Sequence, residues 1–233
     1  MTKLGFLVDS PTSSGRRVSV DVSGVYNFGY AGRDQDSVRE HVRELQKRGV
    51  PAPRIVPTLY PLPIDGATTE STITVFGDQT YGEVEYALLN SPAGWLVTVA
   101  SDHTDAVVET ASVSRAKRAC LDVLAGRAWR LADVADRFDE LELLSECVAG
   151  TDVEASIVQQ GRCGTLLEPA TLLEILGERL RQAPPEGTVI LSGTIGGEPP
   201  CGVERWSMRL RDPRGDAEIR LDYSVRSLAD ELV

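Results

Sequence analysis

Two glutamates stand close together at the head of an apolar run near the middle of the chain, in the stretch GEVEYALL (residues 82–89). Side chains of a strand alternate between its two faces, so Glu83 and Glu85 point the same way, with Cα atoms ~7 Å apart. Ionised carboxylates at this separation repel each other, and burying them without a partner costs free energy. The pair therefore indicates either a solvated strand face or a shared cation. Ala87 and Leu89 continue the same face, which favours an inward orientation.

A third carboxylate, Asp102, follows the next predicted strand, WLVTVA. An adjacent antiparallel strand would deliver this side chain at its end, beside the two glutamates. Three carboxylates without a histidine or cysteine cluster favour a hard cation, with Mg²⁺ first and Mn²⁺ or Ca²⁺ as alternatives. A Glu-x-Glu pair alone is a weak signal, so the solvated face stays open as the other explanation.

The elements around these residues indicate a strand-rich α+β protein with a few peripheral helices. Alternating apolar residues predict an N-terminal hairpin (residues 4–8 and 18–22), strands at TITVF, GEVEYALL, WLVTVA, LELLSECVA, VEASIVQQ and TVIL, and a C-terminal hairpin around Pro213. Helices are expected from Asp34 or Ser37 to Gly49, over 129–138 and over 169–181. The order of strands and helices does not repeat as βαβ units, so a dinucleotide-binding fold is not expected.

A proline-rich passage, VPAPRIVPTLYPLP (residues 50–63), follows the first predicted helix. Proline lacks a backbone N–H and disrupts both helices and central strands. We therefore expect this passage to form an extended arm across the surface.

The composition excludes several classes of partner. A formal net charge of −11 and the lack of a basic run argue against nucleic acid or an anionic membrane as the main partner. No apolar stretch reaches the ~20 residues of a membrane span, and the N-terminus lacks the apolar core of a signal peptide. The four cysteines form no CxxC pair, which is typical of reduced thiols, so a cytoplasmic location is expected.

Four motifs, in their order and spacing, resemble the fumarylacetoacetate hydrolase superfamily, and within it a little-characterised branch known only as a domain of unknown function. GEVEYALL and SDHTD resemble the stretch that binds the metal in this superfamily, which implies Glu83, Glu85 and Asp102 as ligands. A lysine follows in the family, and Lys117 in SVSRAKRAC corresponds to it. VEASIVQQG resembles a glutamine-containing strand, and PPEGTVILSGTIGG resembles a C-terminal Thr-Gly-Thr turn.

The resemblance implies a rolled mixed β-sheet and a Mg²⁺-dependent hydrolase or lyase. Its substrate would be a small carboxylate, namely a 2-oxo acid or an acylpyruvate-type 1,3-diketo compound, reacting through a metal-stabilised enolate. The resemblance also implies a homodimer. We expect a single domain over 1–233, with the hairpin, helix and proline-rich arm in 1–65 and a β-roll catalytic core in 66–233.

The water-activating histidine of hydrolytic members is the weakest point of the resemblance. Arg33, in GYAGRD, stands where that histidine would fall. The stretch HVREL offers His41 and Glu44 instead, and these positions share a helix face. A carboxylate beside an imidazole fixes its tautomer and raises its basicity, so the pair could activate water. A histidine packed against the edge of the core is the alternative.

The remaining candidates each have a functional and a plain explanation. Lys117 would stabilise a developing oxyanion, or it lies on a solvated segment. Arg33 would clamp a carboxylate, or it lies at the surface beside a helix cap. Gly193 and Thr194 would offer an N–H and a hydroxyl to substrate, or they only form a turn. Gln159 would contact substrate, or it is solvated.

Other functions remain open on the same residues. One alternative is a non-catalytic protein that binds a metal or a small acid. Another is a decarboxylase, tautomerase or hydratase that uses the same metal site without an activated water.

Overall fold

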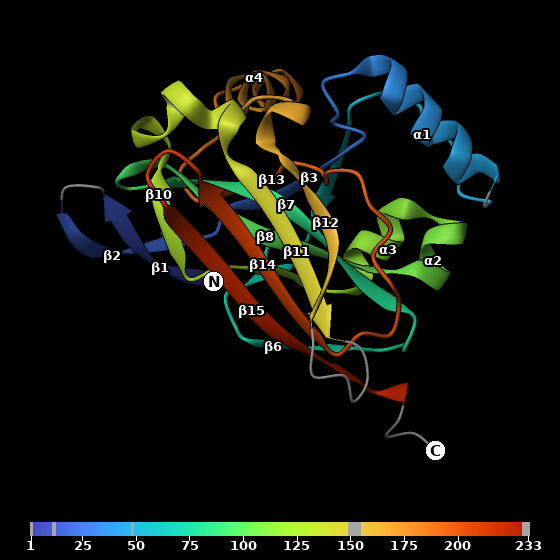
Figure 1. Ribbon diagram of the computed structural model, residues 1–233. Coiled ribbons are helices and arrows are strands. Elements are labelled where there is room, and N and C mark those ends of the chain that lie inside the picture. Colours follow the sequence, from blue (N-terminus) through green and yellow to red (C-terminus); the bar gives the residue numbers. More distant parts are fainter. Residues whose placement is uncertain (1, 11–12, 48, 149–154, 230–233) are drawn as a thin grey trace.

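The computed structural model describes residues 2–10, 13–47, 49–148 and 155–229 (Figure 1). Within these ranges the chain forms a ten-stranded sheet and a five-stranded sheet. The five-stranded sheet lies in front of the larger one in Figure 1, with α1 and α4 at the upper rim. Residues 149–154, on which the ends of two predicted strands fall, lie outside the described part. No helix in the described ranges is long and apolar enough to cross a membrane.

The larger sheet runs in the order β2-β1-β10-β8-β7-β13-β3-β4, and β9 pairs with both β8 and β5 beside this path. Its parallel pairs are β1 with β10, β13 with β3, and β5 with β9. The strands are β1 (Lys3–Ser10), β2 (Ser13–Asp21), β3 (Gly24–Gly29), β4 (Thr58–Leu62), β5 (Ala67–Thr68), β7 (Thr80–Ser91), β8 (Gly94–Asp105), β9 (Asp122–Leu124), β10 (Arg127–Arg130) and β13 (Thr188–Leu191).

The smaller sheet runs in the order β12-β11-β14-β15-β6. Its strands are β6 (Thr72–Val75), β11 (Glu142–Val148), β12 (Ser156–Arg162), β14 (Arg205–Asp212) and β15 (Ala217–Ser227). β14 and β15 pair antiparallel from Arg205↔Ser224 to Asp212↔Ala217. This is the hairpin that the turn residues around Pro213 predict.

Four α-helices and three 3₁₀ turns cover the described part of the sheets. The helices are α1 (Gln35–Lys47), α2 (Ala106–Ala111), α3 (Val113–Ala119) and α4 (Pro169–Leu180), and the 3₁₀ turns are Leu131–Asp133, Ala135–Glu140 and Cys163–Thr165. Asp34 caps α1, because its carboxylate accepts bonds from the Asp36 N–H and the Ser37 hydroxyl.

The helix expected over 129–138 is wrong in its first residues. Residues 127–130 form β10, which pairs parallel with β1 and antiparallel with β8. Trp129 is buried from this strand, and only the two 3₁₀ turns follow. Pairing with two strands outweighed the local helical pattern, which is the usual way in which tertiary context overrides propensity.

Strand β7 separates two apolar cores. Val84, Tyr86 and Leu88 pack into the core that includes residues of the smaller sheet. Ala87 and Leu89 pack into a second core, formed within the curled larger sheet. Because Ala87 and Leu89 are fully buried on the same face as the two glutamates, the predicted inward orientation of that face is confirmed.

The proline-rich passage is more than a surface arm. Its last part is the edge strand β4, which pairs with β3, and Pro61 is tolerated there because one side of an edge strand needs no ladder bond. Tyr60 and Leu62 enter the second core from this strand. The passage therefore helps to wall the space in front of Glu83 and Glu85.

Candidate metal centre

The β7–β8 ladder brings the three predicted carboxylates together. In this antiparallel pair Glu83 lies opposite Asp102, and Glu85 lies opposite Ala100. Residues directly opposite each other project from the same face of the sheet. One carboxylate oxygen each of Glu83, Glu85 and Asp102 lies within 4.8 Å of the other two. The cluster therefore follows directly from the register of one long hairpin.

Burial makes this cluster costly without a counter-charge. Glu85 and Asp102 are fully buried and Glu83 is partly exposed. Burial raises the pKa of Glu83 to about 7 and that of Glu85 to about 8, while the charge of Lys117 acts in the opposite direction on both. Within the described residues, Oε1 of Glu85 has no hydrogen-bond partner. A set of carboxylate oxygens with one unused buried oxygen fits a hard cation.

Lys117 reaches the cluster from α3. Its side chain is only 7% exposed, and its Nζ donates a hydrogen bond to Oδ2 of Asp102. The Lys117 Nζ also lies over the Tyr60 ring, 5.9 Å from its centroid. The structure thus brings Lys117 to the predicted ligands and excludes the alternative of a solvated segment.

Gln159 and Thr194 hold the residue between the two glutamates. The Val84 N–H donates to Oε1 of Gln159 over 2.9 Å, and the Thr194 hydroxyl donates to the Val84 carbonyl over 2.9 Å. The Gln159 amide also donates to the Thr194 hydroxyl (2.8 Å) and to the Ile195 carbonyl (3.0 Å). Both side chains are therefore engaged with the protein, and they fix the backbone from which Glu83 and Glu85 project.

Gly193 binds one of the glutamates directly. Its N–H donates to Oε2 of Glu85 over 2.8 Å. Its φ of 83° lies in the left-handed region, and a Cβ here would stand 2.8 Å from the Phe28 carbonyl oxygen. Only glycine fits this conformation and this approach without strain. The turn after β13 therefore orients a candidate metal ligand.

His41 and Glu44 both lie on the exposed side of α1. Among the described residues no hydrogen bond joins them. The His41 ring instead lies 6.3 Å from the Tyr30 ring, between centroids. Tyr30 has a φ of 58°, and burial raises its pKa, with smaller contributions from Tyr60, Glu109 and Glu83 in that order. The contact that the structure gives His41 is therefore with Tyr30, and not with Glu44.

Glu109 on α2 is a further carboxylate that sequence reasoning missed. Burial raises its pKa, whereas a hydrogen bond and the charge of His41 lower it. The hydrogen bond is donated by the Tyr81 hydroxyl to Oε2 of Glu109 over 2.7 Å. A six-residue helix with two adjacent valines has no readable helical period, so the sequence offers little signal for it.

Arg33 is engaged away from the carboxylate cluster. Its guanidinium forms a two-pronged ion pair with Asp139, at 2.7 and 2.8 Å, and also donates to the Leu166 carbonyl. A substrate carboxylate would have to displace Asp139 to reach it.

His103, the neighbour of Asp102, points to the opposite face of β8. There it is hydrogen-bonded to Tyr223 and Thr80, and burial lowers its pKa to about 4.

Two further buried polar side chains lie in the second core without a partner among the described residues. They are Asp122 on β9 and Asn27 on β3, both fully buried. Burial raises the pKa of Asp122 well above its usual range, with Lys117 opposing and Glu85 adding to the rise. Sequence reasoning missed Asp122, although an aspartate within the apolar run CLDVLA was a usable signal.

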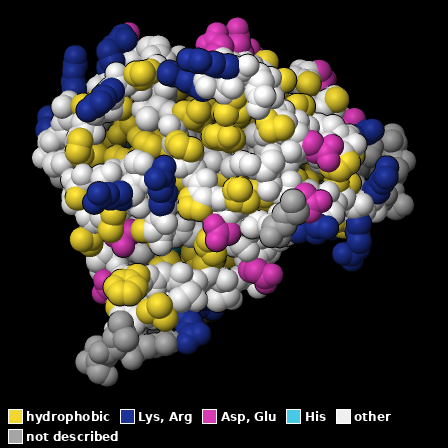
Figure 2. Space-filling model, turned by 180° about the vertical axis from the view of Figure 1, so that it is seen from behind, with side chains coloured by type: hydrophobic (Ala, Val, Ile, Leu, Met, Phe, Trp, Pro, Cys, Tyr) yellow, Lys and Arg dark blue, Asp and Glu magenta, His cyan; other side chains and the backbone are white. Residues whose placement is uncertain are grey.

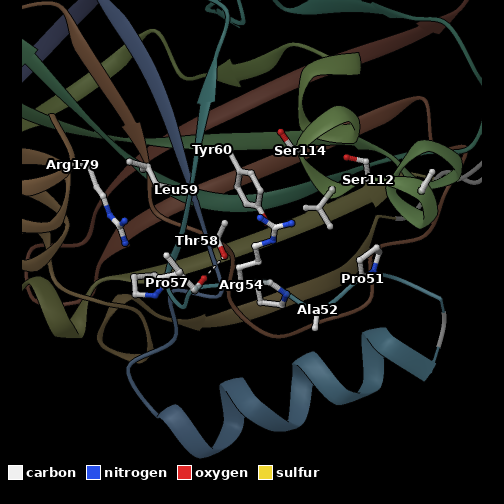
Figure 3. Close-up of a pocket in the computed structure, with 14 residues that line it drawn as sticks. Pro51, Ala52, Arg54, Pro57, Thr58, Leu59, Tyr60, Ser112, Ser114 and Arg179 are labelled. Atoms are coloured by element: carbon white, nitrogen blue, oxygen red, sulfur yellow. Dashed lines mark hydrogen bonds between the residues drawn. The ribbon is translucent and has the colours of Figure 1, made fainter.

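An open groove of about 720 Å³ lies against Tyr60, the ring that neighbours Lys117 (Figure 3). It is lined by the proline-rich passage, by residues 111–114 at the start of α3, and by Arg179 of α4. Tyr60 lines the groove, and its ring centroid lies 5.9 Å from Nζ of Lys117, so this ring links the groove to the lysine of the carboxylate cluster. Arg54 and Arg179 contribute guanidinium groups from the arm and from α4, as Figure 3 shows.

The family model described as "Protein of unknown function (DUF2848)" matches residues 28–223 of this chain. The match covers the Glu-x-Glu strand, Asp102, Lys117 and the glycine turn after β13. A comparison with curated proteins finds no match.

Several solved structures share the fold. A crystal structure of Cg1458 with inhibitor has a TM-score of 0.67 at 18% identity, covering 94% of this chain and 82% of that one. The 2-keto-3-deoxy-D-arabinonate dehydratase complexed with magnesium and 2,5-dioxopentanoate has a TM-score of 0.61 at 12% identity, covering 92% and 77%. Its apo form has a TM-score of 0.59 at 13% identity, with the same coverage. The predicted strand-rich α+β roll is therefore confirmed.

Replacing Gly193 with alanine tests the geometry of the turn. The left-handed φ and the close Phe28 carbonyl should together lower the free energy of unfolding by about 2 kcal/mol, as measured by chemical denaturation. Gly196→Ala is the control, because a Cβ there meets open space and should change stability by less than about 0.5 kcal/mol. Equal stability of the two variants would contradict the described turn.

Proposed function

Because the chain belongs to the DUF2848 family of proteins of unknown function, we propose its function from the metal centre itself. The protein is a Mg²⁺-dependent hydrolase or lyase that acts on a 2-oxo acid or an acylpyruvate-type 1,3-diketo compound. The observation that carries this proposal is the convergence of Glu83, Glu85 and Asp102 within 4.8 Å, beside a buried lysine. Membership of the fumarylacetoacetate hydrolase superfamily belongs to the proposal and is supported by the order of the motifs and by the rolled fold.

The three carboxylates would hold the cation. An all-oxygen donor set suits Mg²⁺ best, with Mn²⁺ and Ca²⁺ as alternatives. The similar dehydratase structure was determined with magnesium, which supports the choice. When bound, the cation supplies a positive charge that polarises a carbonyl oxygen of the substrate.

The residues around the centre would bind the substrate and stabilise its developing charge. The Lys117 ammonium is held against Asp102 in a nearly water-free position, where it can stabilise negative charge on a substrate oxygen. Arg54 and Arg179 in the groove can bind the substrate carboxylate, since guanidinium groups bind carboxylates with paired hydrogen bonds. The apolar wall of prolines beside them suits the carbon chain of such an acid.

His41 is the proposed base that activates water in a hydrolysis. Its ring lies beside Tyr30, and its charge lowers the pKa of Glu109. We therefore assign Glu109, ahead of Glu44, as the carboxylate that supports this imidazole. If His41 is not the base, the same centre supports decarboxylation, tautomerisation or hydration, and the dehydratase among the similar structures favours this second reading.

Titration calorimetry with Mg²⁺ tests the centre. The wild type should bind Mg²⁺, and Glu83→Gln and Glu85→Gln should each weaken the affinity by about 10-fold or more, because each removes one charged ligand oxygen. Glu70→Gln, at an exposed glutamate, is the matched control and should bind as the wild type does. Absence of binding in the wild type would contradict the metal centre.

Assays of oxaloacetate and acylpyruvates with Mg²⁺ test the reaction and the base. His41→Ala should lower hydrolysis by about 10²–10⁴-fold, since that is the usual contribution of a general base, and should leave the Mg²⁺ affinity unchanged. Glu44→Gln should have little effect and Glu109→Gln a larger one. Unchanged hydrolysis in His41→Ala would remove this residue from the mechanism. Mg²⁺ binding without turnover of any such acid would support the non-catalytic alternative.

A homodimer in the cytoplasm completes the proposal. Large hydrophobic side chains are exposed in the described part, with Phe76 at 74% and Ile55 at 53%, and Figure 2 shows hydrophobic side chains gathered between Lys and Arg side chains on one face. Such patches commonly mark interfaces. The four free cysteines suit a reducing compartment. Light scattering should give the mass of two 25.2 kDa chains, and a single-chain mass at all concentrations would contradict the dimer.

A further inference from the structure

Asp122 is the buried group that the proposed function leaves unexplained. Neither carboxylate oxygen has a hydrogen-bond partner within the described residues, and the side chain is fully buried. A buried carboxylate without a partner is among the most costly arrangements in a protein interior. We therefore expect the Asp122 carboxylate to gain a hydrogen-bonding partner in another state of the molecule.

The ladder between β8 and β9 places Asp122 beside the metal centre. Ala100 pairs with Leu124 and Ser101 with Val123, so the next position of this antiparallel register sets Asp102 opposite Asp122. Ala100 and Leu124 face the second core, and Asp102 and Asp122 each lie two residues away on the same face. The row of carboxylates therefore runs from Glu83 through Asp102 to Asp122, across three adjacent strands.

The Lys117 ammonium and a bound cation would both bind the same carboxylate, Asp102. The ammonium is bonded to Asp102, the carboxylate that a cation would also need. The side chain is 7% exposed and lies under the Tyr60 ring, so it cannot simply turn into water. Two positive groups on one carboxylate repel each other, and the ammonium then requires another acceptor.

We propose that Asp122 is a positioning residue that receives the Lys117 ammonium when a cation occupies Asp102. This inference rests on the proposed Mg²⁺ centre and extends it to a fourth carboxylate. The exchange keeps Lys117 buried, charged and next to the centre, where the proposed reaction needs it. It also gives the Asp122 carboxylate a hydrogen-bond donor, which it lacks in the metal-free arrangement.

The test is a double-mutant cycle on Mg²⁺ affinity, measured by titration calorimetry. Asp122→Asn should weaken Mg²⁺ binding by about 10–100-fold, the usual range for groups that support a metal ligand. In the Lys117→Met background the same change should alter the affinity less than about 3-fold, because no ammonium remains to be placed. Thermal unfolding in a chelator should show that Asp122→Asn does not lower the stability of the metal-free protein.

Asp212→Asn is the matched control. Asp212 is also a buried aspartate, but it lies on β14 and pairs with Arg137. This change should lower the stability and leave Mg²⁺ affinity as it is. If Asp122→Asn does not fold, Asp122→Ala provides the same comparison.

Three outcomes would overturn the inference. Wild-type affinity in Asp122→Asn would show that the carboxylate has no part in metal binding, while the proposed centre would stand. An equal loss with and without Lys117 would show that Asp122 does not act through the lysine. Absence of Mg²⁺ binding in the wild type would remove both this inference and the proposed centre.

Discussion

Repulsion between like charges in a buried place is the constraint on which the rest of this structure depends. Glu83 and Glu85 project from one face of β7 into a region where Ala87 and Leu89 are fully buried. Such an arrangement persists only if surrounding groups hold the carboxylates and if positive charge is nearby. Lys117 supplies the positive charge, the Gly193 N–H binds Glu85, and the hydrogen bonds of the Val84 backbone hold the strand between the two glutamates.

The two faces of β7 have different roles, one in packing and one in carrying the carboxylates. One face packs Val84, Tyr86 and Leu88 against the smaller sheet and gives the strand its rigidity. The other face carries the carboxylates beside Lys117, next to the residues of the second core. Ligand groups held on well-packed strands keep their geometry better than groups held on loops, which suits a site whose members must stay within a few ångströms.

Sequence reasoning succeeded where local periodicity and register decide the outcome. The alternation in GEVEYALL predicts the shared face, and the hairpin then needs only its register to bring Asp102 opposite Glu83. It did not succeed where contacts between distant segments determine the position of a residue. The sequence predicts that Gln159 is a substrate contact or a solvated residue, but in the fold it accepts a hydrogen bond from Val84, 75 positions away.

The same limit explains the other misses. Burial of Lys117 depends on two short helices, of six and seven residues, that are too short to show a helical period. Asp122 and Glu109 reach the centre only through the pairing of β9 and the packing of α2. The predicted helix over 129–138 failed because β10 gained two neighbouring strands.

The Gln159 contact has a consequence for cooperativity. Gln159 belongs to β12 in the smaller sheet, and the strand that it holds belongs to the larger sheet. The carboxylate geometry is therefore thermodynamically linked to the docking of the two sheets. Any ligand that prefers the assembled geometry will, by mass action, suppress the partial opening in which one sheet separates from the other.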